Sequence, residues 1–218
     1  MTNNVPKLRF PEYNDEWVTV KLEYLSKKII AGATPKTTIE EYWVGGTVPW
    51  MSSGEVHKKK IYSTDKKITQ EGYDHASTTM IPINCVLVAL AGQGITRGTV
   101  AVNKIKLCTN QSIASIIPND KLNYNYLFYY LEKNYEKLRS LSNSNGGKGS
   151  LNLNILNSLK IKLPLNIKEQ YKISSFISTI DEKIDLLNDK KDEYIEFKHY
   201  LLQNLFPRND ELTPKLRF

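Results

Sequence analysis

The chain has 218 residues, of which 40% are hydrophobic and 24% are charged, so it is long enough for one well-buried domain with an appendage or for two small domains. This composition excludes the disordered and fibrous classes of protein. The sequence contains no run of eighteen apolar residues, and its polar start is broken by Pro6. We therefore expect neither a membrane span nor a signal peptide, and a cytoplasmic location.

Positive charge is concentrated in the first part of the chain. The formal net charge is +7, but residues 1–165 hold 21 Lys and Arg against 13 Asp and Glu, whereas residues 166–218 hold 9 against 10. A basic first part would attract a polyanion such as nucleic acid. Charge alone leaves open the alternative that these lysines only solvate the surface of a protein rich in Lys, Asn and Ile.

Short strands are expected to dominate the first 165 residues, which favours a mixed α/β domain. Residues 81–90 form a near-continuous apolar run, the pattern of a strand covered on both faces. After a glycine-rich turn, residues 99–107 alternate apolar with polar side chains. Residues 112–117 predict another strand.

The glycine-rich turn resembles a dinucleotide-binding fingerprint only in part. Gly92, Gly94 and Gly98 follow an apolar strand, but their spacing is one residue too long and no long helix is expected to follow. The turn instead presents three side chains able to reach base edges and phosphates, namely Gln93, Thr96 and Arg97.

An amphipathic helix is predicted for residues 124–138 from the spacing of leucine and aromatic side chains. Residues 142–150 are rich in Asn, Ser and Gly and predict a flexible loop. Residues 152–163 end at Pro164, which cannot continue a helix and is interpreted as the end of the domain.

The densest cationic run is His57-Lys58-Lys59-Lys60, which is either a solvated loop or a clamp for phosphates. In the flexible loop Lys148 follows a glycine, but Ser142 stands where a P-loop needs its first glycine, so no ATP site is expected. Asn145 and Lys148 remain candidates for contact with a nucleic-acid backbone.

The sequence shows no pattern typical of catalysis or metal binding. The histidines at positions 57, 75 and 199 are far apart and fit no ligand or triad spacing. Cys85 and Cys108 lie in apolar runs without a CxxC neighbour and are expected to be buried thiols. A methyltransferase cofactor motif is also missing. We therefore expect no catalytic residue, no metal and no cofactor.

One long helix is predicted for residues 167–205, because no Pro or Gly occurs there and Pro207 follows. Apolar positions alternate four and three apart, as in a coiled coil, with Lys191 and Lys198 in the same row. At 1.5 Å per residue the helix would be roughly 57 Å long, which favours pairing with a partner helix over the alternative of packing on its own domain. The predicted seam contains Ile173, Ile177, Ile180, Ile184, Leu187, Tyr194, Leu201 and Leu205.

A pentapeptide occurs at both ends of this arrangement. Residues 6–10 read Pro-Lys-Leu-Arg-Phe, and residues 214–218 repeat the same five. Such a repeat predicts one period of a longer unit, followed by the start of a second period.

Taken together, these motifs resemble the specificity subunits of type I restriction-modification systems over nearly the whole chain. The resemblance rests on residues 6–11 with Trp17, 42–50 with Ile68 and Thr69, 110–114, 163–165 with 169–173, and 201–207. It implies a family in which two such units share one chain and each recognition domain reads half of a split DNA target. It also implies that the two long helices pair antiparallel, hold the domains apart and dock methyltransferase subunits.

On this resemblance, residues 1–165 are expected to be a target-recognition domain, residues 166–206 a long dimerising helix, and residues 207–218 the start of a second repeat. Because only one unit is present, the hypothesis is a non-catalytic half-subunit that forms an antiparallel homodimer. It would direct methyltransferase and, through it, restriction subunits to an interrupted target in double-stranded DNA. The candidate DNA contacts are Lys58, Lys59, Lys60, Gln93, Thr96, Arg97, Asn145 and Lys148.

Two other functions are compatible with the sequence. The chain could be a coiled-coil interaction module, or a decoy that sequesters methyltransferase subunits without reading DNA. A third hypothesis is a nuclease or methyltransferase acting alone, which an assay with magnesium or a methyl donor would expose.

Overall fold

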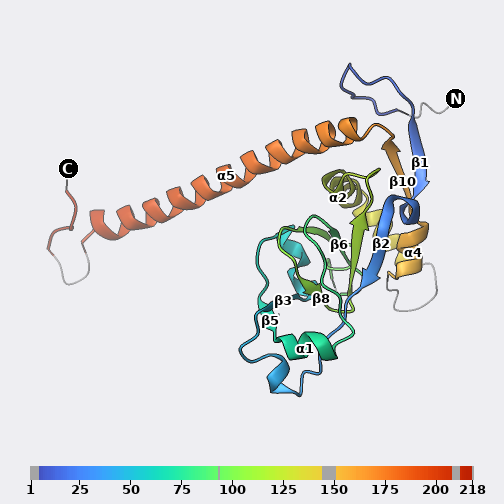
Figure 1. Ribbon diagram of the computed structural model, residues 1–218. Helices are drawn as coiled ribbons and strands as arrows, with labels where there is room; N and C mark the ends of the chain where they lie inside the picture. Colours follow the sequence, from blue (N-terminus) through green and yellow to red (C-terminus); the bar gives the residue numbers. More distant parts are fainter. Residues whose placement is uncertain (1–4, 93, 144–150, 208–211, 218) are drawn as a thin grey trace. The chain divides into compact units, whose positions relative to one another are not determined.

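The computed structural model describes residues 5–92, 94–143, 151–207 and 212–217 (Figure 1). The chain forms two compact units, Met1–Ser174 and Ser175–Phe218, which we describe separately. Among the described residues, none of the helices combines the length and the apolar character needed to cross a membrane.

Three small sheets form the framework of the first unit among the residues that the structure describes. A five-stranded sheet has the order β2-β9-β6-β7-β4, in which β4 is parallel to β7 and the other pairs are antiparallel. Its strands are β2 (Ser26–Ala31), β4 (Lys60–Ile61), β6 (Val86–Ala89), β7 (Val100–Asn103) and β9 (Ile113–Pro118). A second sheet has the order β5-β3-β8, with β3 (Val48–Met51), β5 (Lys66–Ile68) and β8 (Cys108–Thr109). The third pairs β1 (Trp17–Lys21) antiparallel with β10 (Lys160–Pro164). The expected mixed fold with many short strands is confirmed.

The central sheet is buried on both faces, as the apolar run at residues 81–90 predicted. Successive side chains of a strand point to opposite faces, so Val86 and Val88 of β6 pack in one core and Leu87 and Ala89 in the other. The strand is shorter than predicted because Asn84 adopts a positive φ of 62° and Ile81 forms only an isolated bridge.

Two helices replace the single helix predicted for residues 124–138. They are α2 (Tyr124–Lys133) and α3 (Tyr135–Asn143). The side chain of Asn123 caps α2 by accepting the Tyr126 N–H at 2.8 Å. The break falls at Asn134, whose Nδ2 donates to the Tyr130 carbonyl at 2.7 Å. Leu127 and Leu131 of α2 pack in the core that holds Val86 and Val88.

Shorter elements complete the first unit. The segment that ends at Pro164 is divided into α4 (Leu153–Ser158) and strand β10, so Pro164 ends a strand. Besides α1 (Gln70–His75), the described part of the chain contains three 3₁₀ helices: η1 (Leu22–Leu25), η2 (Glu40–Tyr42) and η3 (Ser53–Lys58).

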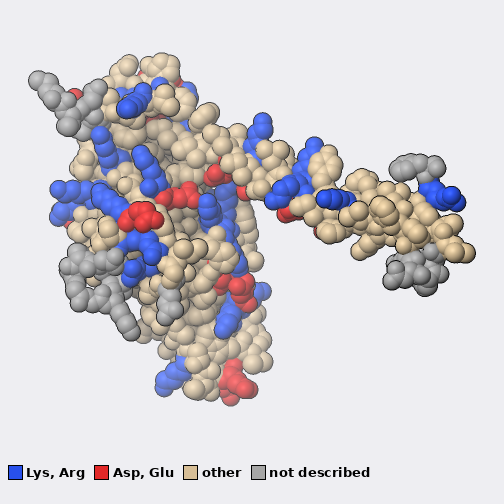
Figure 2. Space-filling view, turned by 180° about the vertical axis from the view of Figure 1, so that it is seen from behind, with Lys and Arg blue, Asp and Glu red and all other residues tan. Residues whose placement is uncertain are grey.

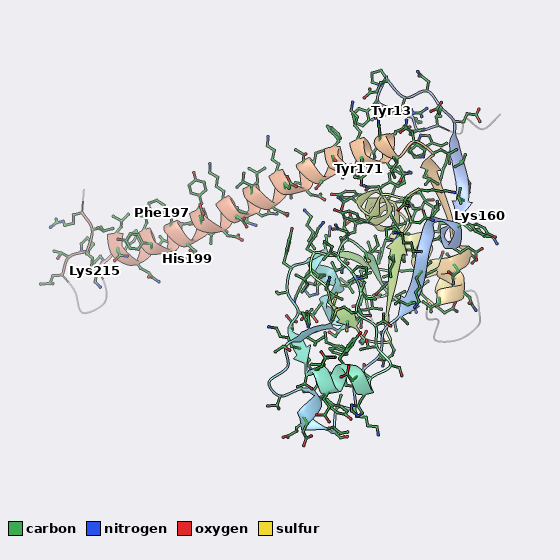
Figure 3. All side chains as sticks on the ribbon, in the orientation of Figure 1. Tyr13, Lys160, Tyr171, Phe197, His199 and Lys215 are labelled. Atoms are coloured by element: carbon green, nitrogen blue, oxygen red, sulfur yellow. The ribbon has the colours of Figure 1, made fainter. Side chains whose placement is uncertain are left out.

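The long helix predicted for residues 167–205 is α5 (Ile167–Leu205), so this prediction is confirmed. The Asn166 side chain accepts the Lys168 N–H at 3.0 Å and so satisfies one of the free donors at the first turn. In the second unit, the Leu216 N–H donates to the Asn204 carbonyl at 2.9 Å near the end of the helix. Phe197 and His199 leave α5 on opposite sides (Figure 3).

Candidate nucleic-acid interface

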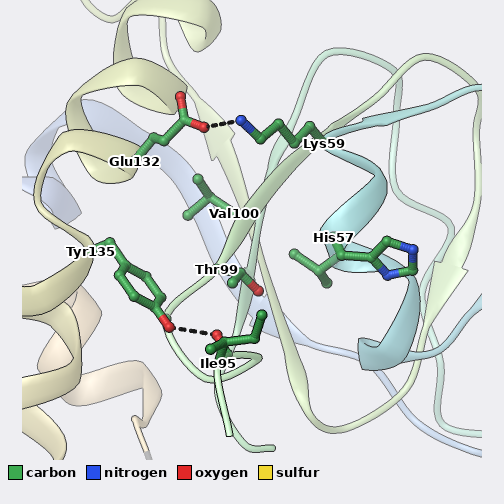
Figure 4. Close-up of a pocket in the computed structure, with 9 residues that line it drawn as sticks. His57, Lys59, Ile95, Thr99, Val100, Glu132 and Tyr135 are labelled. Atoms are coloured by element: carbon green, nitrogen blue, oxygen red, sulfur yellow. Dashed lines mark hydrogen bonds and ion pairs between the residues drawn. The ribbon is translucent and has the colours of Figure 1, made fainter. Parts of the chain in front are cut away.

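A hollow of about 430 Å³ lies in the first unit where three segments meet (Figure 4). The residues that line it are Val56, His57 and Lys59 at the end of η3, Ile95, Gly98, Thr99 and Val100 from the glycine-rich turn and β7, and Glu132 and Tyr135 from α2 and α3. The lysine run and the glycine-rich turn, which the sequence offered as separate candidates, therefore border the same hollow.

Lys58 is held by two carboxylates beside this hollow. Its Nζ lies 3.1 Å from Glu55 Oε2 and 2.6 Å from Asp65 Oδ1. Hydrogen bonds to Asp65 and to Glu55 raise the pKa of Lys58. Glu55 is buried and forms a capping box with Ser52 at the start of η3. A DNA phosphate would therefore have to compete with Asp65 and Glu55 for this lysine.

Lys59 has a backbone φ of 59°, which few residues other than glycine adopt. Its Nζ lies 2.6 Å from Glu132 Oε1, and this ion pair borders the hollow (Figure 4). The next residue, Lys60, is half-buried and pairs with Val102 in the parallel β4·β7 ladder. The three lysines are thus held in three different environments, although they are adjacent in the sequence.

The glycine-rich turn is braced by helix α3. The Tyr135 hydroxyl donates to the Ile95 carbonyl at 2.6 Å, and Arg139 Nη1 donates to the Gly94 carbonyl at 2.7 Å. The glycines are needed for the backbone, since φ is +63° at Gly94 and +86° at Gly98. Ile95 is 79% exposed on this turn, so the turn presents the Ile95 side chain to solvent.

Thr96 and Arg97 are half-buried in the same turn. The Thr96 carbonyl accepts hydrogen bonds from the N–H and the hydroxyl of Thr99, at 3.0 and 2.5 Å. Strand β7 begins directly after the turn, where a dinucleotide site would need the start of a helix. Gln93, Asn145 and Lys148 lie outside the described residues.

Three residues of the helices were missed by the sequence analysis. Glu132, Tyr135 and Arg139 contact the lysine run and the turn. Glu132 and Arg139 occupy polar positions of a helix, and Tyr135 was counted only among the apolar positions of that helix. None of the three belongs to a motif, so only the contacts of α2 and α3 with the lysine run and the turn identify them.

The described residues hold no group of three or more His, Cys, Asp or Glu side chains able to bind a metal ion. Cys85 and Cys108 are both buried, as predicted. Burial raises the pKa of Cys85 to about 12 and that of Cys108 to about 11. Both thiols therefore stay protonated and unreactive at neutral pH.

Acidic side chains accompany the positive charge of the first unit. On the face shown in Figure 2, many Lys and Arg side chains lie together, and Asp and Glu side chains lie among them. The ion pairs of Lys58 and Lys59 are examples of this mixing. Such a surface attracts a polyanion less strongly than its count of lysines indicates.

The predicted seam of α5 extends over both units. Ile173 belongs to the first unit and packs against its larger core. In the second unit Ile180, Ile184, Leu187 and Tyr194 are exposed, whereas Ile177, Leu201 and Leu205 are half-buried. Large apolar side chains outside the seam are also exposed, among them Phe176, Leu186, Phe197 and Tyr200.

Comparison with known proteins gives consistent matches. A family model described as the type I restriction modification DNA specificity domain matches residues 14–196. The chain is 24% identical over 204 residues to the specificity subunit of the type I restriction enzyme EcoR124I/EcoR124II of Escherichia coli, covering 89% of this chain and 50% of that protein. It is 30% identical over 219 residues to the specificity subunit of the type I restriction enzyme MjaIX of Methanocaldococcus jannaschii, covering 92% of this chain and 49% of that protein.

A solved structure shows the same fold. The crystal structure of the HsdS subunit from Thermoanaerobacter tengcongensis is similar with a TM-score of 0.60 and 19% identity, over 83% of this chain and 41% of that chain. The chain thus spans about half the length of the relatives that it matches.

Proposed function

The chain belongs to the type I restriction-modification DNA specificity family, and on that premise we propose that it recognises a DNA sequence on behalf of enzymes that modify or cleave it. The observation that carries this proposal is the family match over residues 14–196, which spans the first unit and most of α5. The two relatives named above are specificity subunits of restriction enzymes. The chain itself would be non-catalytic.

The hollow and its rim are the proposed DNA contact. Lys58 and Lys59 would exchange their carboxylate partners for backbone phosphates, which fixes the position of the domain but reads no base. The braced turn with Thr96 and Arg97 would reach base edges. Lys60, Gln93, Asn145 and Lys148 complete the proposed contact set.

Dimerisation through α5 is the second part of the proposal. Two chains would pair antiparallel along the seam, and a two-fold axis would present identical recognition domains to an inverted, interrupted target. Half-sites would then lie one or two helical turns apart, each turn being about 34–36 Å. Exposed apolar side chains in the seam support this, because a helix keeps such a row in water only at a cost in free energy.

Methyltransferase subunits are the proposed partners of the same helix, with restriction subunits joining through them. Leu186, Phe197 and Tyr200 support this, because they are exposed outside the seam and would stay available after pairing. In this division residues 1–165 read DNA, residues 166–206 pair and dock, and residues 207–218 begin a second repeat.

Binding to duplex DNA with and without a methyltransferase subunit tests the proposal. A pool of random duplexes should yield an enriched bipartite sequence, and affinity should fall about 10³-fold or more between about 50 and 200 mM salt if several phosphates are contacted. Light scattering at micromolar concentration should give the mass of a dimer. A chain that binds the methyltransferase but enriches no sequence would instead be an interaction module or decoy.

A further inference from the structure

A buried ion pair joins the first Pro-Lys-Leu-Arg-Phe segment to the start of α5. Arg9 Nε and Nη2 donate to the two carboxylate oxygens of Glu169 at 2.7 and 2.8 Å. Trp17 Nε1 donates to the same carboxylate at 3.3 Å. The side chain of Glu169 is 0% exposed and that of Arg9 is 13% exposed. A two-pronged bond of this kind recognises a guanidinium specifically.

Phe10 binds beside this ion pair. Lys172 Nζ lies 4.8 Å from the centroid of the Phe10 ring, a cation–π contact. We call Trp17, Glu169 and Lys172 the Glu169 socket. Leu8, in contrast, is 91% exposed. The socket therefore recognises the Arg-Phe pair at the end of the pentapeptide.

The second copy of the pentapeptide carries the same Arg-Phe pair at residues 217–218. Arg217 is exposed, and its side chain makes no ion pair with any other described residue. The neighbouring Leu216 N–H is bonded to the Asn204 carbonyl, which ties this segment to the last turns of α5. The second unit thus holds a copy of the socket's ligand whose arginine is not engaged.

We propose that the Glu169 socket binds residues 217–218 of a second copy of this chain, in exchange with its own Arg9 and Phe10. The inference rests on the antiparallel pairing proposed above. If the seam residues from 173 to 205 overlap fully, Asn204 of one helix lies opposite Ser174 of the other. Ser174 is five residues from Glu169, which is about 7.5 Å along a helix. The tethered Arg217 of one copy then lies within reach of the socket of the other.

The exchange keeps the arginine and phenylalanine contacts in the socket, whereas the ion pair of Lys172 with Glu12, which lies two residues beyond Phe10, would be lost. Both ligands have the same sequence, and in the dimer both are tethered, with effective concentrations on the order of millimolar. The two bound forms should therefore be populated within about tenfold of each other. Exchange of identical segments between protomers is domain swapping, which stabilises a dimer without new contact chemistry. Here it would connect each recognition domain to the partner's helix end.

Photo-crosslinking tests this in the full chain. Phe218 is replaced by benzoylphenylalanine, and the protein is mixed with an isotope-labelled unmodified chain before illumination. We expect crosslinks between light and heavy chains at the residues around Trp17, Glu169 and Lys172. Arg9→Ala in the heavy chain empties the socket and should raise the crosslink yield about two- to tenfold. Arg217→Ala in the light chain should abolish the crosslinks.

Two results would overturn the inference. One is a dimer with no crosslink at the socket, and the other is a crosslink that persists undiminished with Arg217→Ala. Lys215→Ala in the light chain is the matched control, because it removes one positive charge from the same segment and should leave the yield unchanged. Sedimentation of the same samples distinguishes the two hypotheses. A dimer without the crosslink would refute only the exchange at the socket, whereas a monomer would refute the proposed pairing of α5 itself.

A peptide of residues 212–218 with a fluorescent label tests the socket without the dimer. The Arg9→Ala chain should bind it at least about tenfold more tightly than a peptide carrying Arg217→Ala. The unmodified chain, whose socket is filled, should bind it more weakly than Arg9→Ala. Equal affinity for both peptides would overturn the inference, and because the decisive change is in the peptide, a folding defect cannot mimic this result.

Discussion

Lys59 Nζ lies 2.6 Å from Glu132 Oε1, so a lysine of the proposed DNA contact already has a carboxylate partner in the free protein. The pair joins the residue after η3 to α2 and borders the hollow that the glycine-rich turn also lines. Glu132 neutralises Lys59 in the free protein, as a DNA phosphate would in the complex. Lys59 can therefore bind a phosphate only if other contacts in the complex compensate for breaking its ion pair with Glu132.

Glu132→Gln should therefore raise the affinity for DNA of random sequence. An exposed ion pair contributes about 0.2–1 kcal/mol, so a gain of about 1.4- to fivefold is expected, together with a smaller ratio of specific to non-specific binding. Fluorescence anisotropy with random duplexes measures this. Glu136→Gln on α3 is the matched control, because Glu136 is exposed and does not line the hollow. Equal gains from both variants would show that only net charge matters.

The main strands and helices could be predicted from the sequence, but the pairing of the strands could not. The apolar run around β6 and the period of α5 are local signals, and both elements were found. The break at Asn134 was missed because one asparagine whose side chain bonds the preceding turn interrupts an otherwise continuous helical period. Local patterns therefore gave the elements more accurately than their boundaries.

The candidate site shows the same division. The lysine run and the glycine-rich turn stood out by composition, whereas Glu132, Tyr135 and Arg139 did not, because their contacts join segments far apart in the sequence. The Arg9–Glu169 pair spans 160 residues, and no local spacing indicates it. Ion pairs between residues far apart in the sequence can be identified only from the folded structure.

Arg97→Ala should weaken specific DNA binding by about 1–3 kcal/mol and relax preference at one base pair if the side chain reads a base. Sequence enrichment from a random pool, compared with the unmodified chain, measures both effects. Lys106→Ala is the control, because Lys106 is exposed, carries the same charge and does not line the hollow. If Arg97→Ala and Lys106→Ala behave alike, residues 92–98 are not the reader.

Removing the hydrogen bond between α3 and the glycine-rich turn should change DNA recognition more than it changes stability. Tyr135→Phe removes the hydroxyl that donates to the Ile95 carbonyl. The free energy of unfolding should fall by about 0.5–1.5 kcal/mol, while the enriched DNA sequence becomes less defined because the turn loses its fixed conformation. Tyr24→Phe serves as the control, since Tyr24 is an exposed tyrosine of η1. An unchanged enrichment profile would contradict the role of the brace.

Gln170 is fully buried and satisfies three backbone groups at once. Its Nε2 donates to the carbonyls of Lys121 and Pro164 at 3.0 and 2.9 Å, and its Oε1 accepts the Asn123 N–H at 2.9 Å. Gln170→Leu would leave these groups unpaired in the core, so the free energy of unfolding should fall by about 2–5 kcal/mol. Urea unfolding measures the loss. Gln203→Leu, at an exposed position of the same helix, should change it by less than about 0.5 kcal/mol.

The two buried thiols predict that the free energy of unfolding falls at alkaline pH. Because burial raises the pKa of Cys85 to about 12 and that of Cys108 to about 11, the folded chain keeps thiol protons that the unfolded chain releases near about pH 8.5. The thiol contribution to stability is therefore present below that pH and lost as the pH rises towards the folded pKa values. A thiol reagent should label neither cysteine at about pH 8 until urea unfolds the chain. Labelling of the native protein would contradict this.

Leu186 and Leu187 are adjacent, both exposed, and on different sides of α5, so they separate the two surfaces proposed for the helix. Leu187 lies in the seam and is 57% exposed, whereas Leu186 lies outside it and is 67% exposed. Leu187→Asp would place a charge in each half of an apolar interface, so the dissociation constant of the dimer should rise by at least about 100-fold, or about 3 kcal/mol.

Leu186→Asp should leave the dimer intact but weaken the binding of a methyltransferase subunit. Sedimentation equilibrium measures the first effect and co-purification the second. Equal weakening of the dimer by both variants would mean that α5 does not pair along the row from Ile173 to Leu205, because only one of the two leucines belongs to that row.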